Sequence, residues 1–263
     1  MTPLLVVAAL FGLAVGSFLN VVIHRVPAAM SLSRPGSHCP ACDHPIRTRH
    51  NVPVVGWLVL RGRCADCRAP ISVRYPLVEL ATAVLFVGIA WRLADLDLLP
   101  ALPALLWFTA MGVSLTMIDL DVRRLPDAIV FPSYGVIAAL LVTAAWIGHD
   151  PAALLRAAVG AVALFAGYFL LAFFYPGGMG FGDVKLAGIV GGVLGFLGYP
   201  VLLVGAFAAF FIGAFVGIAK VLVSRGTAGR SLAFGPFMIA GALLSVFVGP
   251  TVADVYSRLA LGG

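Results

Sequence analysis

Acidic residues are scarce in this chain, which makes their positions informative: only 11 Asp and Glu residues occur among 263. Asp119 lies in the stretch Ile118-Asp-Leu-Asp-Val-Arg-Arg-Leu-Pro-Asp127, and Asp183 ends the stretch Gly178-Met-Gly-Phe-Gly-Asp183. Two carboxyl groups brought together can share one proton, so that one acts as a base on water while the other donates to a carbonyl oxygen. Asp119 and Asp183 are therefore candidate catalytic residues for the hydrolysis of a peptide bond.

Glycines surround the second acid, at positions 177, 178, 180 and 182. Because glycine adopts left-handed and very tight conformations, this loop can bring Asp183 close to another helix and to an extended peptide. A purely structural interpretation is also open. Asp119 can pair with Arg123 or Arg124, and Asp183 can simply cap a helix.

Four cysteines form a second candidate site, in the pairs Cys39-Pro-Ala-Cys42 and Cys64-Ala-Asp-Cys67, which are separated by 21 residues. Two such pairs predict a structural zinc ion held by four thiolates. A closed site of this kind has no open position for water, so the metal would hold the segment together and would not catalyse hydrolysis. The alternatives are unliganded thiols, a redox pair, or a nearby histidine in place of one sulfur: His38, His44 or His50.

The composition defines the elements that must position these residues. Of the 263 residues 62% are hydrophobic and 11% are charged, whereas soluble chains are about 25% charged. The sequence thus predicts an all-α polytopic membrane protein and excludes a secreted disulfide scaffold, a disordered regulator and a conventional soluble enzyme. About eight stretches have the length and apolar character of a transmembrane helix: 4–23, 76–93, 101–118, 128–147, 153–174, 184–198, 200–222 and 232–252.

The predicted domain organisation is a retained first transmembrane helix (1–23), a small zinc-binding subdomain (24–75) and a polytopic domain with seven transmembrane helices (76–263). Basic loops remain in the cytoplasm. With the polar subdomain inside, all but three of the 17 Lys and Arg residues lie on the cytoplasmic side. The net charge of +6 is thereby explained by topology, and we expect no nucleic-acid partner. Both candidate acids then face the same cytoplasmic boundary, where ionisable residues are functional candidates.

Several motifs agree in order and spacing, and together they resemble the type IV prepilin peptidases, a family of bifunctional leader peptidases and N-methyltransferases of the GxGD type. Asp119 lies seven residues before Pro126, as the first catalytic aspartate of the family does, and Asp183 matches the second. The other matching segments are Gly16-Ser-Phe-Leu-Asn-Val-Val-Ile-His-Arg-Val-Pro27, Ser37-His-Cys-Pro-Ala-Cys42, Arg61-Gly-Arg-Cys-Ala-Asp-Cys67, Arg74-Tyr-Pro-Leu-Val-Glu-Leu80 and Gly180-Phe-Gly-Asp-Val-Lys-Leu186.

The resemblance implies a multi-pass protein of the bacterial inner membrane with a cytoplasmic catalytic face. Its substrates would be prepilins and pseudopilins, cleaved after a glycine and then methylated at the new N-terminus with S-adenosylmethionine. Gly180 and Gly182 are candidate substrate-binding residues. Glu79, the only glutamate, would bind the methyl donor or the substrate amine, or else be a buried partner of an arginine. Asp121 would stay solvated, and Asp127 would cap the following helix.

Two departures from the family pattern fall in the part associated with methylation. The chain has Arg49-His50-Asn51 where the family often has Tyr-Asp-Asn, and Ala83 where it usually has glycine. No glycine-rich nucleotide loop occurs between 24 and 80, so S-adenosylmethionine binding rests on the resemblance alone.

Two other classes of protein compete with the protease. In a transporter, Asp119 and Asp183 would relay protons or coordinate cations near the middle of the bilayer, with the zinc loop as a regulator. In a membrane adaptor, the zinc loop would only recruit cytoplasmic partners, which leaves the GxGD loop unexplained. The predicted position of both acids at one membrane edge favours the protease.

Overall fold

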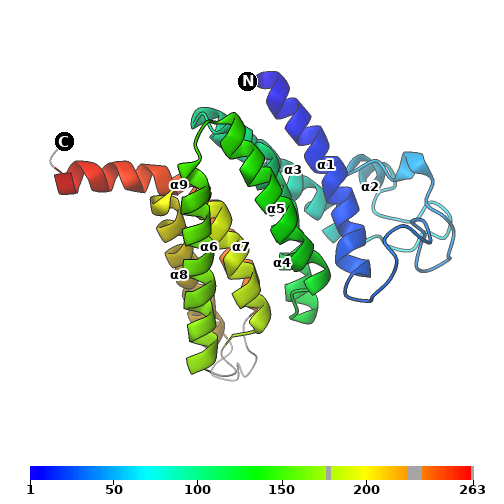
Figure 1. The fold of residues 1–263 in the computed structure, drawn as a ribbon. Helices are drawn as coiled ribbons and strands as arrows, with labels where there is room; N and C mark the ends of the chain where they lie inside the picture. Colours follow the sequence, from blue (N-terminus) through cyan, green and yellow to red (C-terminus); the bar gives the residue numbers. More distant parts are fainter. Residues whose placement is uncertain (176–178, 224–232, 262–263) are drawn as a thin grey trace. The chain divides into compact units, whose positions relative to one another are not determined.

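The computed structural model describes residues 1–175, 179–223 and 233–261. The predicted all-α class is confirmed, since the described residues contain helices, turns and two isolated β-bridges but no strand (Figure 1). Gly177 and Gly178, two of the glycines singled out near Asp183, lie outside the described residues. The chain divides into two compact units, Met1–Ala94 and Asp95–Gly263.

Seven of the described helices are long and apolar enough to cross a membrane: Thr2–Arg25, Arg74–Asp95, Leu99–Val122, Asp127–Ile147, Ala152–Phe174, Tyr199–Val223 and Gly235–Val252. The predicted stretch 184–198 corresponds to α7 (Phe181–Leu197), which has 17 residues. At about 26 Å it is shorter than the hydrocarbon core of about 30 Å. About eight spans were predicted, and seven described helices meet the criteria of length and composition. The eighth predicted stretch is α7, a shorter helix that is mostly buried.

In the first unit, α1 (Thr2–Arg25) and α3 (Arg74–Asp95) pack antiparallel with their backbones in close contact. A Cβ atom on Gly12 would lie 2.6 Å from the Cα of Ala83, and one on Gly16 would lie 2.7 Å from the Cα of Glu79. One turn further along, Asn20 Nδ2 donates to the Tyr75 carbonyl at 3.2 Å. Small residues four apart are a common device for close packing of membrane helices. The backbone of Ala83 can thus approach α1 closely because Gly12 has no side chain.

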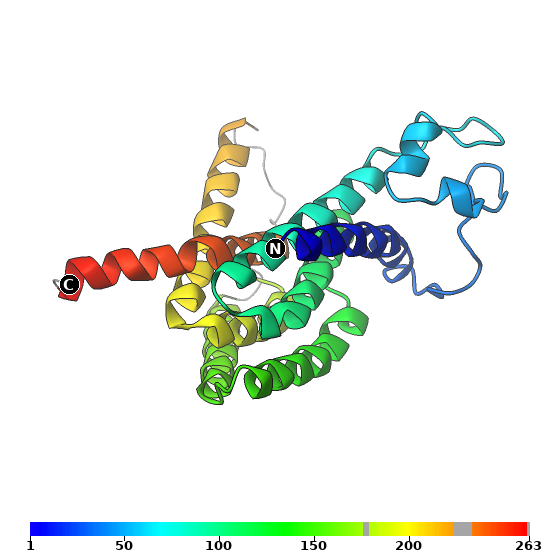
Figure 2. The same cartoon turned by 90° about the horizontal axis from the view of Figure 1, so that it is seen from above.

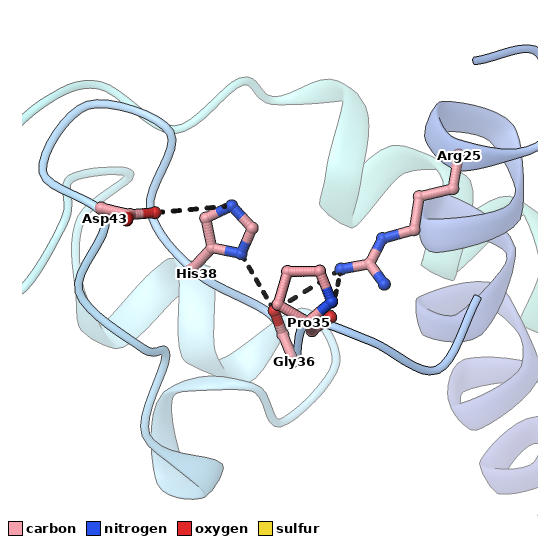
Figure 3. Close-up of polar contacts among 5 residues, drawn as sticks. All are labelled: Arg25, Pro35, Gly36, His38 and Asp43. Carbon is pink, nitrogen blue, oxygen red and sulfur yellow. Dashed lines mark hydrogen bonds and ion pairs between the residues drawn. The ribbon is translucent and has the colours of Figure 1, made fainter. Parts of the chain in front are cut away.

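The polar segment between these helices is fixed to the end of α1 by a buried arginine (Figure 3). Arg25 is 6% exposed, and its Nη2 donates to the carbonyl of Pro35 at 2.7 Å and of Gly36 at 3.5 Å. His38 continues the network, with Nδ1 3.0 Å from the Gly36 carbonyl and Nε2 3.7 Å from Asp43 Oδ1. The network ties the segment that leads to the first cysteine pair to the end of α1. The short helices η1 (Thr48–His50) and α2 (Val55–Val59) follow.

The second unit contains α4 (Leu102–Val122), α5 (Asp127–Ile147), α6 (Ala152–Phe174), α7, α8 (Tyr199–Val223) and α9 (Gly235–Leu261), with the short η2 (Leu99–Ala101) before α4. Most of α7 is buried, and it contacts each of the other five long helices. Figure 1 shows α6, α7 and α8 side by side, and Figure 2 shows α8 crossing α9. The helix α7, which carries Asp183 in its first turn, therefore lies at the centre of this unit.

Glycine allows α6 and α7 to touch backbone to backbone. A Cβ atom on Gly191 would collide with the Gly160 carbonyl oxygen, and one on Gly195 would collide with the carbonyl oxygen of Arg156. On the adjacent position of α7, a Cβ on Gly192 would meet nothing closer than 3.7 Å. Two neighbouring glycines of the same helix therefore differ in what they can tolerate.

We expect Gly191→Ala to destabilise the protein by about 1–3 kcal/mol, because the added methyl group forces α6 and α7 apart. Gly192→Ala is the matched control, and its stability should be unchanged or slightly raised since alanine favours helix. Thermal unfolding of both variants in detergent checks this. Equal melting temperatures for the two variants would contradict the close α6–α7 contact.

Candidate active site and metal centre

Asp119 lies in the last turn of α4, within the helix and not after it. The predicted stretch ended at residue 118, but the helix continues to Val122 and stops at Arg123, whose left-handed backbone (φ 53°, ψ 45°) lets its N–H donate to the Asp119 carbonyl. The Asp119 side chain is buried, and the residue is 5% exposed. The first acid is thus held on a rigid element at a helix end.

Asp183 is the third residue of α7, as expected for an acid at a helix N-terminus. Its Oδ2 accepts a hydrogen bond from the Gly180 N–H at 3.2 Å, and its own N–H donates to the Gly180 carbonyl at 3.0 Å. Gly180 has an ordinary extended backbone (φ −77°, ψ 147°), so the expected left-handed conformation is not found there. Gly182 serves a different purpose, since a Cβ on it would lie 3.1 Å from the Leu125 side chain.

The two acids lie near each other, since the Leu125 side chain would contact a Cβ both on Gly182, next to Asp183, and on Gly235, next to Asp119. They lie close enough for the charge of Asp119 to act on Asp183. Among the described residues, Asp119 Oδ2 is the one buried side-chain oxygen or nitrogen without a hydrogen-bond partner. Leaving such an oxygen unpaired costs free energy, and in native proteins this marks catalytic or ligand-binding groups. Asp119 Oδ2 is therefore a candidate for a reacting or ligand-binding oxygen, and the backbone N–H of Gly235 acts on the same carboxyl group.

Two residues beside this pair were missed by the sequence analysis. Gly235, the first residue of α9, lies so close to Asp119 that a Cβ there would be 2.9 Å from Oδ2. Leu125 lies between Gly182 and Gly235 and would contact a Cβ on either one. The only local signal was the glycine before Pro236 at the start of an apolar stretch, which marks a helix start but not its neighbour.

A third missed residue, Tyr168 on α6, is buried and lies within the electrostatic influence of Asp183. Its ring contacts those of Phe210 and Phe234, at centroid distances of 5.6 and 6.0 Å. No pattern in the sequence distinguishes this tyrosine from the other aromatic residues of an apolar helix.

The other two acids of the first group have structural surroundings. Asp127 does not cap its helix, because α5 has no side-chain cap; instead its Oδ1 pairs with Lys185 Nζ at 2.7 Å. Lys185 also lies over the rings of Phe131 and Phe181, at 4.8 and 5.2 Å. This ion pair joins the start of α5 to the start of α7 and thereby positions Asp183. Asp121 is exposed.

Glu79 is buried on α3, and its partner is a backbone amide and not an arginine. Its Oε2 accepts a hydrogen bond from the Val54 N–H at 2.7 Å. Val54 has φ 60° and ψ −51°, a conformation that is rare for a β-branched residue. Glu79 therefore secures the strained start of α2 against the transmembrane helix.

The four cysteines converge. All four Sγ atoms of Cys39, Cys42, Cys64 and Cys67 lie within 4.8 Å of one another, and the Cys39 and Cys67 sulfurs are 3.8 Å apart. Sulfurs about 2.3 Å from a central zinc ion would be about 3.8 Å apart in a tetrahedron, so the group can hold a metal ion. None of the three nearby histidines belongs to the cluster that the described residues form.

The two cysteine pairs are folded alike. The Cys39 N–H donates to the His44 carbonyl at 2.9 Å, and the Cys64 N–H donates to the Ala69 carbonyl at 2.8 Å. The residue after the second cysteine of each pair has a left-handed backbone: Asp43 with φ 59° and Arg68 with φ 63°. Each pair thus forms a knuckle that presents two sulfurs to a shared centre.

Local hydrogen bonds prepare the cluster for a cation. The backbone N–H groups of Cys67 and Asp66 lower the pKa of the Cys64 thiol to about 6. A hydrogen bond from the His44 backbone acts in the same sense on Cys42, but burial and the neighbouring thiols raise the pKa of Cys42 to about 12. The four sulfurs cannot all ionise side by side, whereas a bound metal cation would stabilise four thiolates.

The fold and the sites define a class of protein: a multi-pass membrane protein with two buried aspartates at helix ends and a cluster of four cysteines that can hold a metal ion. Residues 10–93 match the family model described as the bacterial peptidase A24 N-terminal domain, and residues 105–218 match the type IV leader peptidase family. The chain belongs to this family of prepilin leader peptidases.

Relatives from several bacteria cover nearly the whole chain. It is 39% identical to a prepilin leader peptidase/N-methyltransferase of Neisseria gonorrhoeae, over 87% of this chain and 85% of the relative. It is 36% identical to the protein of the same name from Aeromonas hydrophila, over 94% and 91%. A type 4 prepilin-like proteins leader peptide-processing enzyme of Escherichia coli O78:H11 is 35% identical over 92% and 93%. No solved structure shows a significant match.

The geometry of the sulfurs predicts one bound metal ion per chain, because a closed tetrahedral site is saturated by four ligands. Elemental analysis of the purified protein measures this ratio. Cys64→Ser should lower the metal content, since an alcohol does not ionise in place of the thiolate. His38→Ala removes a neighbouring side chain that hydrogen-bonds Gly36 and should leave the metal content unchanged. If His38→Ala lost the metal and Cys64→Ser kept it, the four cysteines would not be the ligands.

Proposed function

We propose that this protein is a membrane aspartic endopeptidase that removes the leader peptide of type IV prepilins and pseudopilins by cleavage after a glycine. The observation that carries the proposal is the buried, unpartnered Oδ2 of Asp119 beside Asp183. The names of the relatives supply the class of substrate.

The two aspartates divide the work of hydrolysis. One carboxylate accepts a proton from a water molecule whose oxygen attacks the scissile carbonyl carbon, while the other carboxyl group donates a proton to the carbonyl oxygen. The C–N bond then breaks as the leaving amine is protonated. Asp183 Oδ2 is oriented by the Gly180 N–H, whereas Asp119 Oδ2 has no such partner. Asp119 therefore offers the oxygen that binds the water or the carbonyl group.

The loop before Asp183 suits an extended peptide. Gly180 and Gly182 present no side chain, so a substrate backbone can approach the start of α7. We assign these glycines to substrate binding, next to the two catalytic aspartates.

The catalytic face is cytoplasmic in this proposal. Basic residues concentrate in the loops on the side of the two aspartates, which the positive-inside rule places in the cytoplasm. A prepilin leader has not crossed the membrane, so it meets the enzyme on that side while the apolar segment of the pilin remains in the bilayer. Asp119 lies in the last turn of α4 and Asp183 in the first turn of α7, whereas a transporter would place its acids in the middle of such helices.

A second activity, N-methylation of the new N-terminus with S-adenosylmethionine, is proposed for the part around residues 24–80. The names of the relatives join the two activities. The metal of the four-cysteine cluster is proposed to be zinc with a structural role, since a closed sulfur site leaves no position for a substrate. Glu79 is a candidate for binding the methyl donor or the substrate amine through the carboxylate oxygen that does not contact Val54.

Asp119→Asn and Asp183→Asn should each reduce leader cleavage by at least about 10³-fold, because each removes a group that must exchange protons with the substrate. The assay is incubation of the purified protein in detergent with a prepilin, followed by mass measurement of the product. Asp121→Asn is the matched control, since this acid is exposed on the same turn of α4, and it should cleave almost normally. Retained cleavage in either of the first two variants would remove that residue from the mechanism.

Cys39→Ser should reduce methylation more than cleavage, because the metal cluster belongs to the first unit and both aspartates belong to the second. The same assay with S-adenosylmethionine added separates the activities, since methylation adds one methyl group to the mass of the cleaved pilin. Ser37→Ala, next to the cluster, is the control. Equal loss of both activities would mean that the metal cluster also supports the peptidase site.

A further inference from the structure

The helix α2 has an exposed apolar face that the rest of the polar segment does not cover. Val55, Leu58 and Val59 are spaced to lie on one side of the helix, and they are 53%, 59% and 71% exposed. Val52, in the turn before the helix, is 46% exposed. Contiguous apolar groups of this kind on a polar segment mark an interaction surface.

The opposite face of α2 is fully engaged inside the polar segment. Gly56 packs so closely against the His50 carbonyl that no Cβ would fit there. The Trp57 indole N–H donates to the Ile71 carbonyl at 3.1 Å, and its ring lies against Gly62. Because these contacts fix the rotation of α2, the apolar face is held outward and cannot turn into the subdomain.

The point at which α2 is attached to α3 indicates how deep the apolar face lies relative to the bilayer. Val54, immediately before α2, donates to Glu79 on α3, and Glu79 is the sixth residue of that helix. It therefore lies about 7.5 Å along the helix axis from the start of α3. The whole helix of 22 residues is about 33 Å long, close to the hydrocarbon core of about 30 Å. The start of α2 is thus held within about 7.5 Å, measured along α3, of the end of that helix, near the boundary of the hydrocarbon core.

Basic residues near this face complement a lipid surface. Arg49, Arg61, Arg63 and Arg68 are all exposed and lie in the turns before and after α2 or in the second cysteine knuckle. Cations beside an apolar face are typical of helices that lie in the plane of the membrane and bind anionic headgroups.

We propose that the face formed by Val52, Val55, Leu58 and Val59 is embedded in the interface of the bilayer, with the neighbouring arginines on anionic lipid headgroups. The metal-binding subdomain is then fixed at the membrane surface at three places: the ends of α1 and α3 and the face of α2. This proposal depends on the membrane-spanning helices of the first unit and not on the proposed catalytic activities.

The test uses the full chain in nanodiscs that contain phosphatidylglycerol and lipids with brominated acyl chains, with one genetically encoded fluorescent amino acid. At position 58 we expect several-fold stronger quenching by the brominated lipids than by aqueous iodide. Asp43 is the matched control position, because its side chain is 94% exposed and lies in the same subdomain; there we expect the reverse. Val59→Glu should weaken the lipid quenching at position 58, whereas Val59→Ile should preserve it.

Two results would overturn the proposal. Iodide quenching at position 58 as strong as at position 43 would mean that the face is exposed to water. Protection at position 58 from both quenchers would mean that protein covers it, either the second unit or another chain. The metal content of each labelled protein is measured as well, because an intact metal site indicates that the labelled subdomain is folded.

Discussion

The second unit depends on the close approach of the α6 and α7 backbones. Between apolar helices in a bilayer the hydrophobic effect contributes little, so packing of small residues is a main source of association. Gly160, Gly191 and Gly195 permit contacts that any side chain would block. This allows α7 to lie at the centre, in contact with all the other long helices of the unit. A buried central helix is what carries Asp183 to the end of α4.

In the resulting site, the polar groups at the rim have partners, whereas one oxygen at the centre has none. Around its rim, the ion pair of Lys185 with Asp127 and the two aromatic rings beside the lysine are well formed. At its centre, two acids are buried near each other and one oxygen of Asp119 has no partner. Burying these groups costs free energy, which the close helix packing around them offsets. Native proteins accept such local conflicts at functional sites.

The types of element and the identity of the chemical groups were predictable because their signals are local. Apolar runs indicate membrane helices, and two C-x-x-C pairs indicate four converging sulfurs. The end of α4 was not predictable, because hydropathy falls at Asp119 while the helix continues until the left-handed Arg123 stops it. Gly235 and Leu125 were missed for a different reason. Their importance comes only from contacts with residues far away in the chain, and no short pattern encodes such a contact.

Two buried acids on transmembrane helices, Glu79 and Asp119, differ in their hydrogen bonding. Glu79 and Asp119 are 8% and 5% exposed, so burial alone does not separate them. Glu79 accepts a short hydrogen bond from the Val54 N–H and holds a strained turn in place, so moving it would disturb the backbone. Asp119 Oδ2 has no short hydrogen bond of this kind, although the Gly235 N–H acts on the same carboxyl group. In the proposed function Asp119 binds water and exchanges a proton, and its environment suits this role because the helix end fixes the carboxyl group without a short hydrogen bond to Oδ2.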